Sequence, residues 1–146
     1  MKRSAGELVL GGLLAAMAVG QASDPARFRE ILAGYRTIPP PLEPAAAAAI
    51  VVAEAVAGAT LLTGRGRRFG GRLAVGVATA WAAIGLGAFT RQVPVDNCGC
   101  FGEHLAQPLR WWVLVEDAEL LALAVWVARR TSRPTERRLS APSATP

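Results

Sequence analysis

Hydrophobic residues run along this chain in four long stretches that are separated by short polar segments. The stretches cover residues 5–22, 44–63, 72–90 and 111–128. Each is about as long as a helix must be to cross a hydrocarbon core of about 30 Å. Backbone polar groups in lipid must be satisfied within their own segment, and helices achieve this. The pattern therefore predicts an all-α fold, an integral membrane bundle of four helices within residues 1–130.

The first stretch has a second interpretation. A basic start, "MKR", followed by a short apolar run and by "VGQA" before Ser23, has the layout of a cleavable signal peptide. A retained first helix combines with the three later stretches into an even-numbered bundle, which is the simpler topology. We therefore expect the first helix to be retained, and cleavage is the alternative.

The distribution of basic residues predicts the orientation of the bundle. Eleven of the 16 lysines and arginines fall at the N-terminus, around the segment between the second and third stretches, or after the fourth stretch. The other five fall in the two remaining loops. Because lysine and arginine accumulate on the cytoplasmic side, both termini are predicted to be cytoplasmic. The tail, residues 131–146, is rich in proline and serine and is predicted to be disordered.

The overall composition agrees with a membrane protein. Hydrophobic residues make up 52% of the chain and charged residues only 18%. The net charge of +5 follows from arginines near helix ends, and no basic patch interleaved with aromatic residues is present. We expect a lipid bilayer as the environment and no nucleic-acid partner.

The first loop on the outer side, between the first two stretches, contains a helix signal of its own. In "DPARFREILAGY", Asp24 can cap a helix with Pro25 at its first position. Phe28, Ile31 and Leu32 then follow at helical spacing. The pattern predicts a short amphipathic helix that ends before "IPPP". Such a helix could be an ordinary loop element or could cover a functional site.

The second outer loop, "VDNCGCFGEH", contains the only two cysteines and the only histidine of the chain. A disulfide between Cys98 and Cys100 requires a sharp bend at Gly99, which tolerates positive φ. A bridge in so small a ring should be strained, and strained exposed disulfides exchange readily. A permanent clip across one residue would constrain the unfolded chain very little. The loop therefore predicts a redox-active thiol pair on the oxidising side of the membrane.

Metal binding is the alternative function for this loop. Cys98, Cys100, His104 and Asp96 lie close enough in sequence to share a zinc or copper ion. No further cysteine or histidine exists elsewhere in the chain, and we therefore expect no metal. His104 is then either an exposed loop residue or a group that lowers the pKa of a nearby thiol.

Acidic residues within the predicted membrane segments are the second chemical signal. Glu54 lies near the middle of the second stretch, and Glu116, Asp117 and Glu119 lie in the outer third of the fourth. A carboxylate at such a depth should face a partner or the bundle interior. Glu54 could form a structural hydrogen bond between helices, and the other three could be wetted at the interface. The functional alternative is a proton path coupled to thiol oxidation.

Several of these features resemble the methylamine-utilisation MauE family of DoxX-like four-helix membrane proteins. The similar segments are "DPARFREILAGYRTIPP", "AEAVAGATLLTG" around Glu54, and "DNCGCFG". The last segment adds Phe101 and Gly102 to the candidate site. The sequence departs from the family at Gln21, where similar sequences often have a lysine near the outer end of the first helix. The resemblance implies a role in maturation of exported proteins of the methylamine dehydrogenase type, with a thioredoxin-like partner.

The resulting hypothesis is a multi-pass protein of the bacterial inner membrane with its cysteine loop outside the cytoplasm. Cys98 and Cys100 would exchange electrons with the thioredoxin-like partner. Glu54, with Asp117 or Glu119, would manage protons or bind a redox carrier such as a quinone, although no quinone motif is present in the sequence. The alternatives are a non-enzymatic membrane assembly factor and a metal-binding membrane protein.

Overall fold

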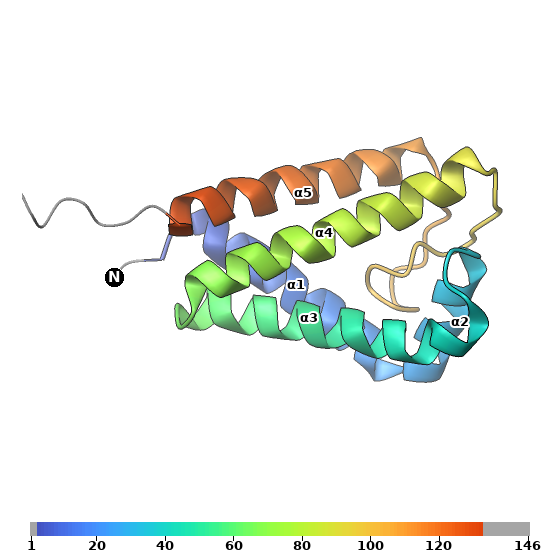
Figure 1. Cartoon of the computed structure of the whole chain (residues 1–146), viewed down its shortest axis with the longest axis horizontal. Coiled ribbons are helices and arrows are strands. Elements are labelled where there is room, and N and C mark those ends of the chain that lie inside the picture. The colour runs from blue at the N-terminus through green and yellow to red at the C-terminus, as the bar shows by residue number, and fades with distance from the viewer. Residues whose placement is uncertain (1–2, 133–146) are drawn as a thin grey trace, which may run out of the picture.

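The structure is a computed structural model that describes residues 3–132, and this part of the chain is helical without strands. The all-α prediction is therefore confirmed. Figure 1 shows α1 beside α3 and α4 beside α5, with α2 at the end of the bundle opposite the N-terminus. The elements are α1 (Ala5–Ser23), α2 (Pro25–Gly34), the 3₁₀ turn η1 (Pro40–Leu42), α3 (Glu43–Thr63), α4 (Arg67–Thr90) and α5 (Trp111–Ser132).

The hydrophobic stretches predicted the bounds of the first two long helices within one residue. The other two helices are longer than predicted, because α4 begins at Arg67 instead of residue 72 and α5 runs to Ser132 instead of 128. Both extensions carry arginines, which the apolar pattern excludes. The pattern marks the part of a helix that can lie in hydrocarbon, whereas the helix itself continues into the polar region.

Three elements are long and apolar enough to cross a membrane: α1, the continuous segment Pro40–Thr63 that contains α3, and α4. Helix α5 has 22 residues, but Glu116, Asp117 and Glu119 lie in its first half and it is not among the three. Within residues 3–132, three of the four expected crossings thus correspond to helices that are long and apolar enough to span a membrane. The fourth, residues 111–128, stays a prediction.

The first turn of α1 is fastened to the start of α4. Ser4 caps the helix, and its backbone N–H donates to Glu7 Oε2 at 2.7 Å in a capping box. The Arg67 guanidinium donates to both oxygens of Glu7, with an Nη2–Oε2 distance of 2.9 Å. Glu7 is 1% exposed, so this carboxylate is buried but fully paired.

Small residues allow α1 and α3 to approach closely. A Cβ atom added to Gly58 would lie 2.9 Å from Gly11 O and from Ala15 N. Close approach of backbones through small residues is a common way for membrane helices to associate. The packing of α4 on α5 is similarly extensive, whereas α1 and α5 contact each other only slightly. Their contact includes Gly6 and Trp126, near the N-terminal end of α1.

Helix α2 confirms the short amphipathic helix that the first loop predicted. Asp24 Oδ1 accepts a hydrogen bond from the backbone N–H of Arg27 at 2.9 Å, and Phe28, Ile31 and Leu32 are buried. The helix lies across the end of the bundle, where the loop 91–110 folds back toward it (Figure 1). The buried face of α2 therefore covers the end of the bundle at which the cysteines lie.

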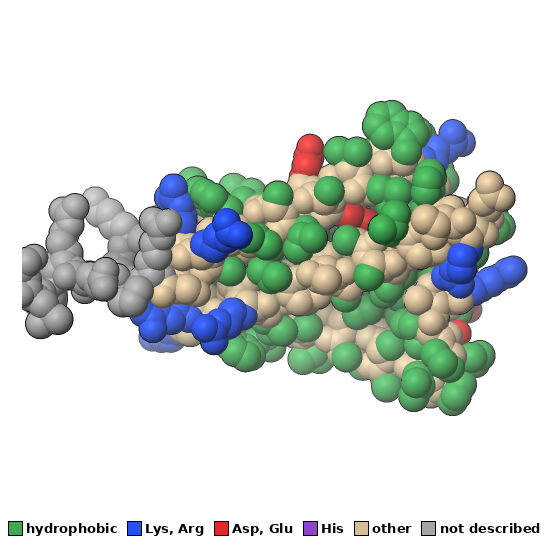
Figure 2. Space-filling view, turned by 45° about the horizontal axis from the view of Figure 1, so that its top comes forward, with side chains coloured by type: hydrophobic (Ala, Val, Ile, Leu, Met, Phe, Trp, Pro, Cys, Tyr) green, Lys and Arg blue, Asp and Glu red, His purple; other side chains and the backbone are tan. Residues whose placement is uncertain are grey.

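Basic side chains gather at the two ends of the bundle, with a largely apolar surface between them (Figure 2). This distribution suits a protein that crosses a bilayer. Which end faces the cytoplasm stays a prediction. The predicted disordered tail lies outside the described residues, except for Thr131 and Ser132, which complete α5.

Candidate functional site

The cysteine loop is held in shape by its own hydrogen bonds. Gly99 N–H donates to Asn97 Oδ1 at 2.9 Å, and Asn97 Nδ2 donates to Gly102 O at 3.0 Å. The backbone N–H of Gly102 donates to Gly99 O, which closes a tight turn around the cysteines. Cys98 N–H donates to Gln107 O at 2.8 Å and connects the turn to the part of the loop that leads back to α5. The loop is thus an ordered element without regular secondary structure.

Two distant side chains fasten the loop to the helices. The Tyr35 hydroxyl at the end of α2 donates to Cys98 O at 2.7 Å, and Gln21 Nε2 on α1 donates to Cys100 O at 3.1 Å. Tyr35 and Gln21 are both almost completely buried, so these bonds are shielded from water. The backbone carbonyls of both cysteines are therefore fixed by side chains from other elements.

Glycine is required at two positions of this loop. Gly99 has φ 78° and Gly102 has φ 65°, in the left-handed region that other residues rarely adopt. The loop also touches α1 backbone to backbone, because a Cβ atom on Gly20 would lie 2.6 Å from Phe101 O. The predicted bend at Gly99 is therefore present, and a small residue on α1 makes room for the loop.

The two sulfurs lie next to each other in the reduced state. Their separation is 3.6 Å, whereas a disulfide requires about 2.05 Å. Cys98 is 2% exposed, and Cys100 is partly exposed. A small movement within the turn would bring the sulfurs to bonding distance, and Cys100 is the more accessible of the two.

The pKa values of the two thiols are shifted in opposite directions. The hydrogen bond with the Cys100 thiol, supported by the Cys100 backbone N–H, lowers the pKa of Cys98 to about 7 against the effect of burial. The same hydrogen bond, together with burial, raises the pKa of Cys100 well above its ordinary range. Burial and the neighbouring thiols raise the pKa of Tyr35, which therefore keeps its proton as a donor. At pH 7 the Cys98 thiol is therefore about half ionised, whereas Cys100 keeps its proton.

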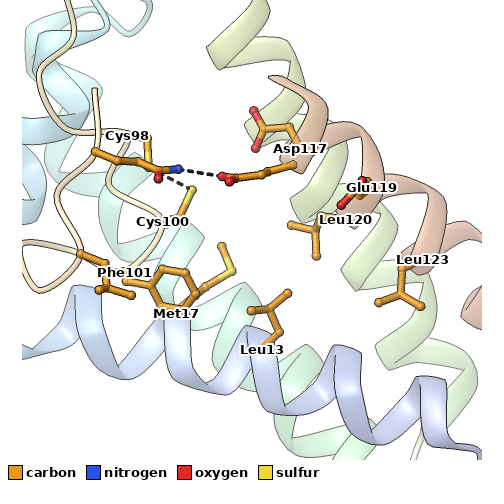
Figure 3. A pocket seen from close by; sticks show the side chains of 12 residues that line it. Leu13, Met17, Cys98, Cys100, Phe101, Asp117, Glu119, Leu120 and Leu123 are labelled. Carbon is orange, nitrogen blue, oxygen red and sulfur yellow. Dashed lines mark hydrogen bonds between the residues drawn. The ribbon is translucent and has the colours of Figure 1, made fainter. Parts of the chain in front are cut away.

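Both sulfurs open into a cavity of about 470 Å³ between the loop, α1 and α5 (Figure 3). Leu13 and Met17 contribute the α1 wall, and Leu120 and Leu123 contribute part of the α5 wall. The remaining lining residues come from the cysteine loop and from the first turns of α5, and they are Cys98, Cys100, Phe101, Leu105, Gln107, Glu116, Asp117 and Glu119.

All three acidic residues of α5 line this cavity. Glu116 accepts a hydrogen bond from Gln107 Nε2 at 2.7 Å, Asp117 is 7% exposed, and Glu119 is exposed. The structure thus places Asp117 and Glu119 along the same cavity as the cysteines. By helical spacing alone, Asp117 would lie on a different face of α5 from Glu116 and Glu119. A cavity bounded by a loop as well as by helices receives side chains from a wider arc of α5.

Glu54 lies elsewhere, in the interior of the bundle, and does not line the cavity. It is fully buried, and its Oε1 accepts a hydrogen bond from Trp81 Nε1 at 2.7 Å. Its Oε2 has no partner within the described residues, and neither has the buried oxygen of the neighbouring Gln21. Glu54 forms the interhelical hydrogen bond that was its structural alternative, and one of its oxygens remains available.

The structure does not bring His104 to the sulfurs. His104 Nε2 is hydrogen-bonded to Ser23 Oγ at 2.8 Å, and His104 and Asp96 are both exposed. Within residues 3–132 no group of three histidine, cysteine or acidic side chains is arranged to hold a metal ion. Phe101 and Gly102 contribute to the loop, the first by lining the cavity and the second through its turn.

Sequence reasoning missed the aromatic residues that support the site. Trp81 packs against the rings of Tyr35 and Phe28, with centroid distances of 6.4 Å for both pairs. Tyr35 is the only tyrosine of the chain and Trp81 lies within a predicted membrane segment. An indole N–H and a carboxylate that are both buried in hydrocarbon each require a hydrogen-bond partner. This requirement could have predicted the pairing of Trp81 with Glu54.

The fold and the site together define an all-helical protein with membrane-length helices and a dithiol held at one end. The family model "Methylamine utilisation protein MauE" matches residues 4–130. The chain therefore belongs to the MauE family, a membership that associates it, as a membrane protein, with methylamine utilisation. No curated protein and no solved structure shows significant similarity to the chain.

Proposed function

We propose that the protein is a membrane thiol–disulfide exchange protein that supports maturation of exported proteins, with Cys98 and Cys100 as its redox pair. The observation that carries the proposal is the 3.6 Å separation of two free sulfurs in a loop whose backbone is fixed from α1 and α2. A structural clip would have no need of two thiols with opposite pKa shifts, whereas an exchanging pair does.

The accessibility and acidity of the thiols suggest the order of events. A thiolate of the partner attacks Cys100 in the disulfide form, because Cys100 is the more exposed. The Cys98 sulfur leaves as a thiolate, and its lowered pKa favours departure. The second partner thiolate then attacks the mixed disulfide, the partner becomes a disulfide, and Cys100 leaves as a thiol after taking up a proton. Two electrons pass from the partner to the Cys98–Cys100 pair.

The partner expected for this reaction is a thioredoxin-like protein outside the cytoplasm. In this proposal α5 is the fourth membrane crossing, both termini are cytoplasmic, and the cysteine loop faces the exterior of the bacterial inner membrane. The family's link to methylamine utilisation points to clients of the methylamine dehydrogenase type. The exposed edge of the loop around Glu103 to Leu105 is open to such a partner.

Substitution of one cysteine at a time tests the proposal. In cells that also produce a variant of the thioredoxin-like partner with only its attacking cysteine, Cys98→Ser should accumulate a mixed disulfide through Cys100, because neither protein then has a second thiol to resolve it. Cys100→Ser should accumulate less, because Cys98 is buried. Non-reducing electrophoresis after acid quenching and thiol alkylation measures both adducts.

A double variant separates the redox function from an assembly factor that needs no thiols. Cys98→Ser with Cys100→Ser should abolish maturation of the client. Full maturation in the double variant would overturn the proposal, and Ser132→Ala, far from the loop at the end of α5, serves as a control with unchanged thiols.

A further inference from the structure

The cavity beside the dithiol extends as a cleft along the seam between α1 and α5. On its other side α1 packs closely on α3, but α1 and α5 contact each other only slightly. The cleft begins at the cysteines and includes Leu13 on α1 and Leu123 on α5. Leu123 lies about 18 Å along α5 from Trp111, at 1.5 Å per residue. In a hydrocarbon core of about 30 Å, the cleft therefore descends beyond the headgroup region.

The two ends of the cleft differ in chemistry. The end near the loop holds the two sulfurs and the carboxyl groups of Glu116 and Asp117. The deeper end is walled by Leu13, Leu120 and Leu123 (Figure 3). A complementary ligand has a compact polar head that exchanges hydrogen bonds and a long apolar tail. A cavity of about 470 Å³ is of the size that binds such a head with the first part of its tail.

We infer that this cleft binds a lipid-soluble quinone, with its ring beside Cys98 and Cys100 and its tail between α1 and α5. The inference rests on the proposed function and supplies the acceptor that the reduced pair needs. A phospholipid chain would fill the apolar end but would make no use of the sulfurs and carboxyl groups. A water-soluble oxidant would match the polar end alone.

The electron balance of the reaction is complete. Two S–H bonds of the dithiol break and one S–S bond forms, which releases two electrons and two protons. The quinone takes up both electrons and both protons at its two oxygens and becomes a quinol. Glu116 and Asp117 can accept hydrogen bonds from the quinol hydroxyl groups. Glu54 is buried outside the cleft, so the quinone role that its depth suggested moves to the α5 acids.

Stoichiometric oxidation of the full-length protein tests the inference. The reduced protein in lipid nanodiscs is mixed with decylubiquinone, and quinone reduction is followed by absorbance while free thiols are counted by alkylation. We expect one quinone reduced for every two thiols lost. Diamide, a water-soluble oxidant, serves as a control that oxidises the dithiol without the cleft.

A bulky substitution in the deep part of the cleft tests the site without altering the cysteines. Leu123→Trp should slow oxidation by decylubiquinone at least about fivefold, since overfilling a site typically costs about 1–3 kcal/mol. Oxidation by diamide should stay within about twofold of the wild type. Leu86→Trp makes the same change on the exposed face of α4, where Leu86 is 54% exposed, and should leave both rates unchanged.

Photolabelling of the wild-type protein tests the quinone site without relying on correct folding of Leu123→Trp. An azido-quinone photoprobe in the same nanodiscs should label peptides from residues 10–20 and 116–124. Labelling confined to α3 or α4, or equal quinone rates in Leu123→Trp and Leu86→Trp, would overturn the quinone site.

The outcomes also distinguish this inference from the proposed function. If Cys98→Ser traps the partner but decylubiquinone does not oxidise the wild-type dithiol, thiol exchange stands and the quinone site is wrong. If decylubiquinone oxidises the dithiol but no mixed disulfide forms with the partner, the quinone site stands and the proposed partner reaction is wrong.

Discussion

One end of the helix bundle and its interior hold their buried acids in opposite ways. At the start of α1, Glu7 receives hydrogen bonds from Ser4 and an ion pair from Arg67, so both of its oxygens are occupied. Near the middle of α3, Glu54 receives a single hydrogen bond from Trp81, and its second oxygen has no partner within the described residues. Both side chains are almost unexposed, at 1% and 0%, but Glu7 lines a polar pocket at the end of the bundle whereas Glu54 lies deep in its interior.

The difference in hydrogen bonding distinguishes a structural ion pair at Glu7 from a region around Glu54 that can react. A carboxylate with a full set of charged and polar partners can change its state only by losing them, which makes it a structural element. Glu54 has an oxygen without a partner in the described part of the chain, and its neighbour Gln21 holds the dithiol loop through Cys100 O, so this region can respond to changes in protonation and oxidation state. The three predictions below test this comparison, from the largest expected effect to the smallest.

Removal of the charge of Glu7 should destabilise the protein most. Glu7→Gln leaves the Arg67 guanidinium without its carboxylate, and we expect a loss of about 3 kcal/mol, at the low end for a broken buried pair because Arg67 is 20% exposed. Thermal unfolding in nanodiscs, followed by circular dichroism, measures the loss. The control is Glu30→Gln, which breaks the exposed pair with Arg27 and should cost less than about 1 kcal/mol. Equal losses for the two variants would remove the distinction.

The acidity of Cys98 should depend on its neighbour. With a pKa of about 7, Cys98 is mostly thiolate above pH 7 and mostly thiol below it. Cys100→Ala removes the hydrogen bond that lowers this pKa, so the pKa should rise toward about 8.5. The thiolate fraction at pH 7 then falls from about one half to a few per cent, a change of about 2 kcal/mol. Thiolate absorbance as a function of pH measures it, and an unmoved midpoint would show that Cys100 is not the cause.

Conversion of Glu54 to its amide should have the smallest effect on stability. In Glu54→Gln the remaining oxygen still accepts from Trp81, and the new N–H₂ group can donate to the unpartnered oxygen of Gln21. We expect a change of less than about 1 kcal/mol in the unfolding free energy. Glu54→Leu removes the acceptor of Trp81 as well and should cost about 2 kcal/mol. A loss for Glu54→Gln as large as that for Glu7→Gln would show that Glu54 is held by its charge.

The sequence predicted the long helices well because length and apolarity are local properties. Helices α1 and α3 begin and end within one residue of the hydrophobic stretches, and α2 was evident from its cap and its spacing. The shape of the cysteine loop was not predictable in the same way. It depends on the bonds of Tyr35 to Cys98 and of Gln21 to Cys100, which join residues 63 and 79 positions apart.

The candidate site was predicted in its parts but not in its arrangement. Cys98, Cys100, Asp117 and Glu119 line one cavity, whereas Glu54 and His104 lie away from it. Which helices leave a gap between them is decided by packing along their whole length. Gly11 and Gly58 allow α1 to pack closely on α3, and this packing leaves the α1–α5 seam open.

The backbone contact between Gly20 and the Phe101–Gly102 peptide has a mechanical consequence. The cysteine loop is anchored on α1 by this contact and by Gln21, while the acids of the cleft belong to α5. The sulfurs are thus held from α1 and the carboxyl groups belong to α5, on the two sides of the cleft. Because Gln107 also ties the loop to Glu116 on α5, a displacement of α1 relative to α5 would change the width of the cleft and strain the loop at the same time, which couples access to the dithiol with the geometry of the cysteines.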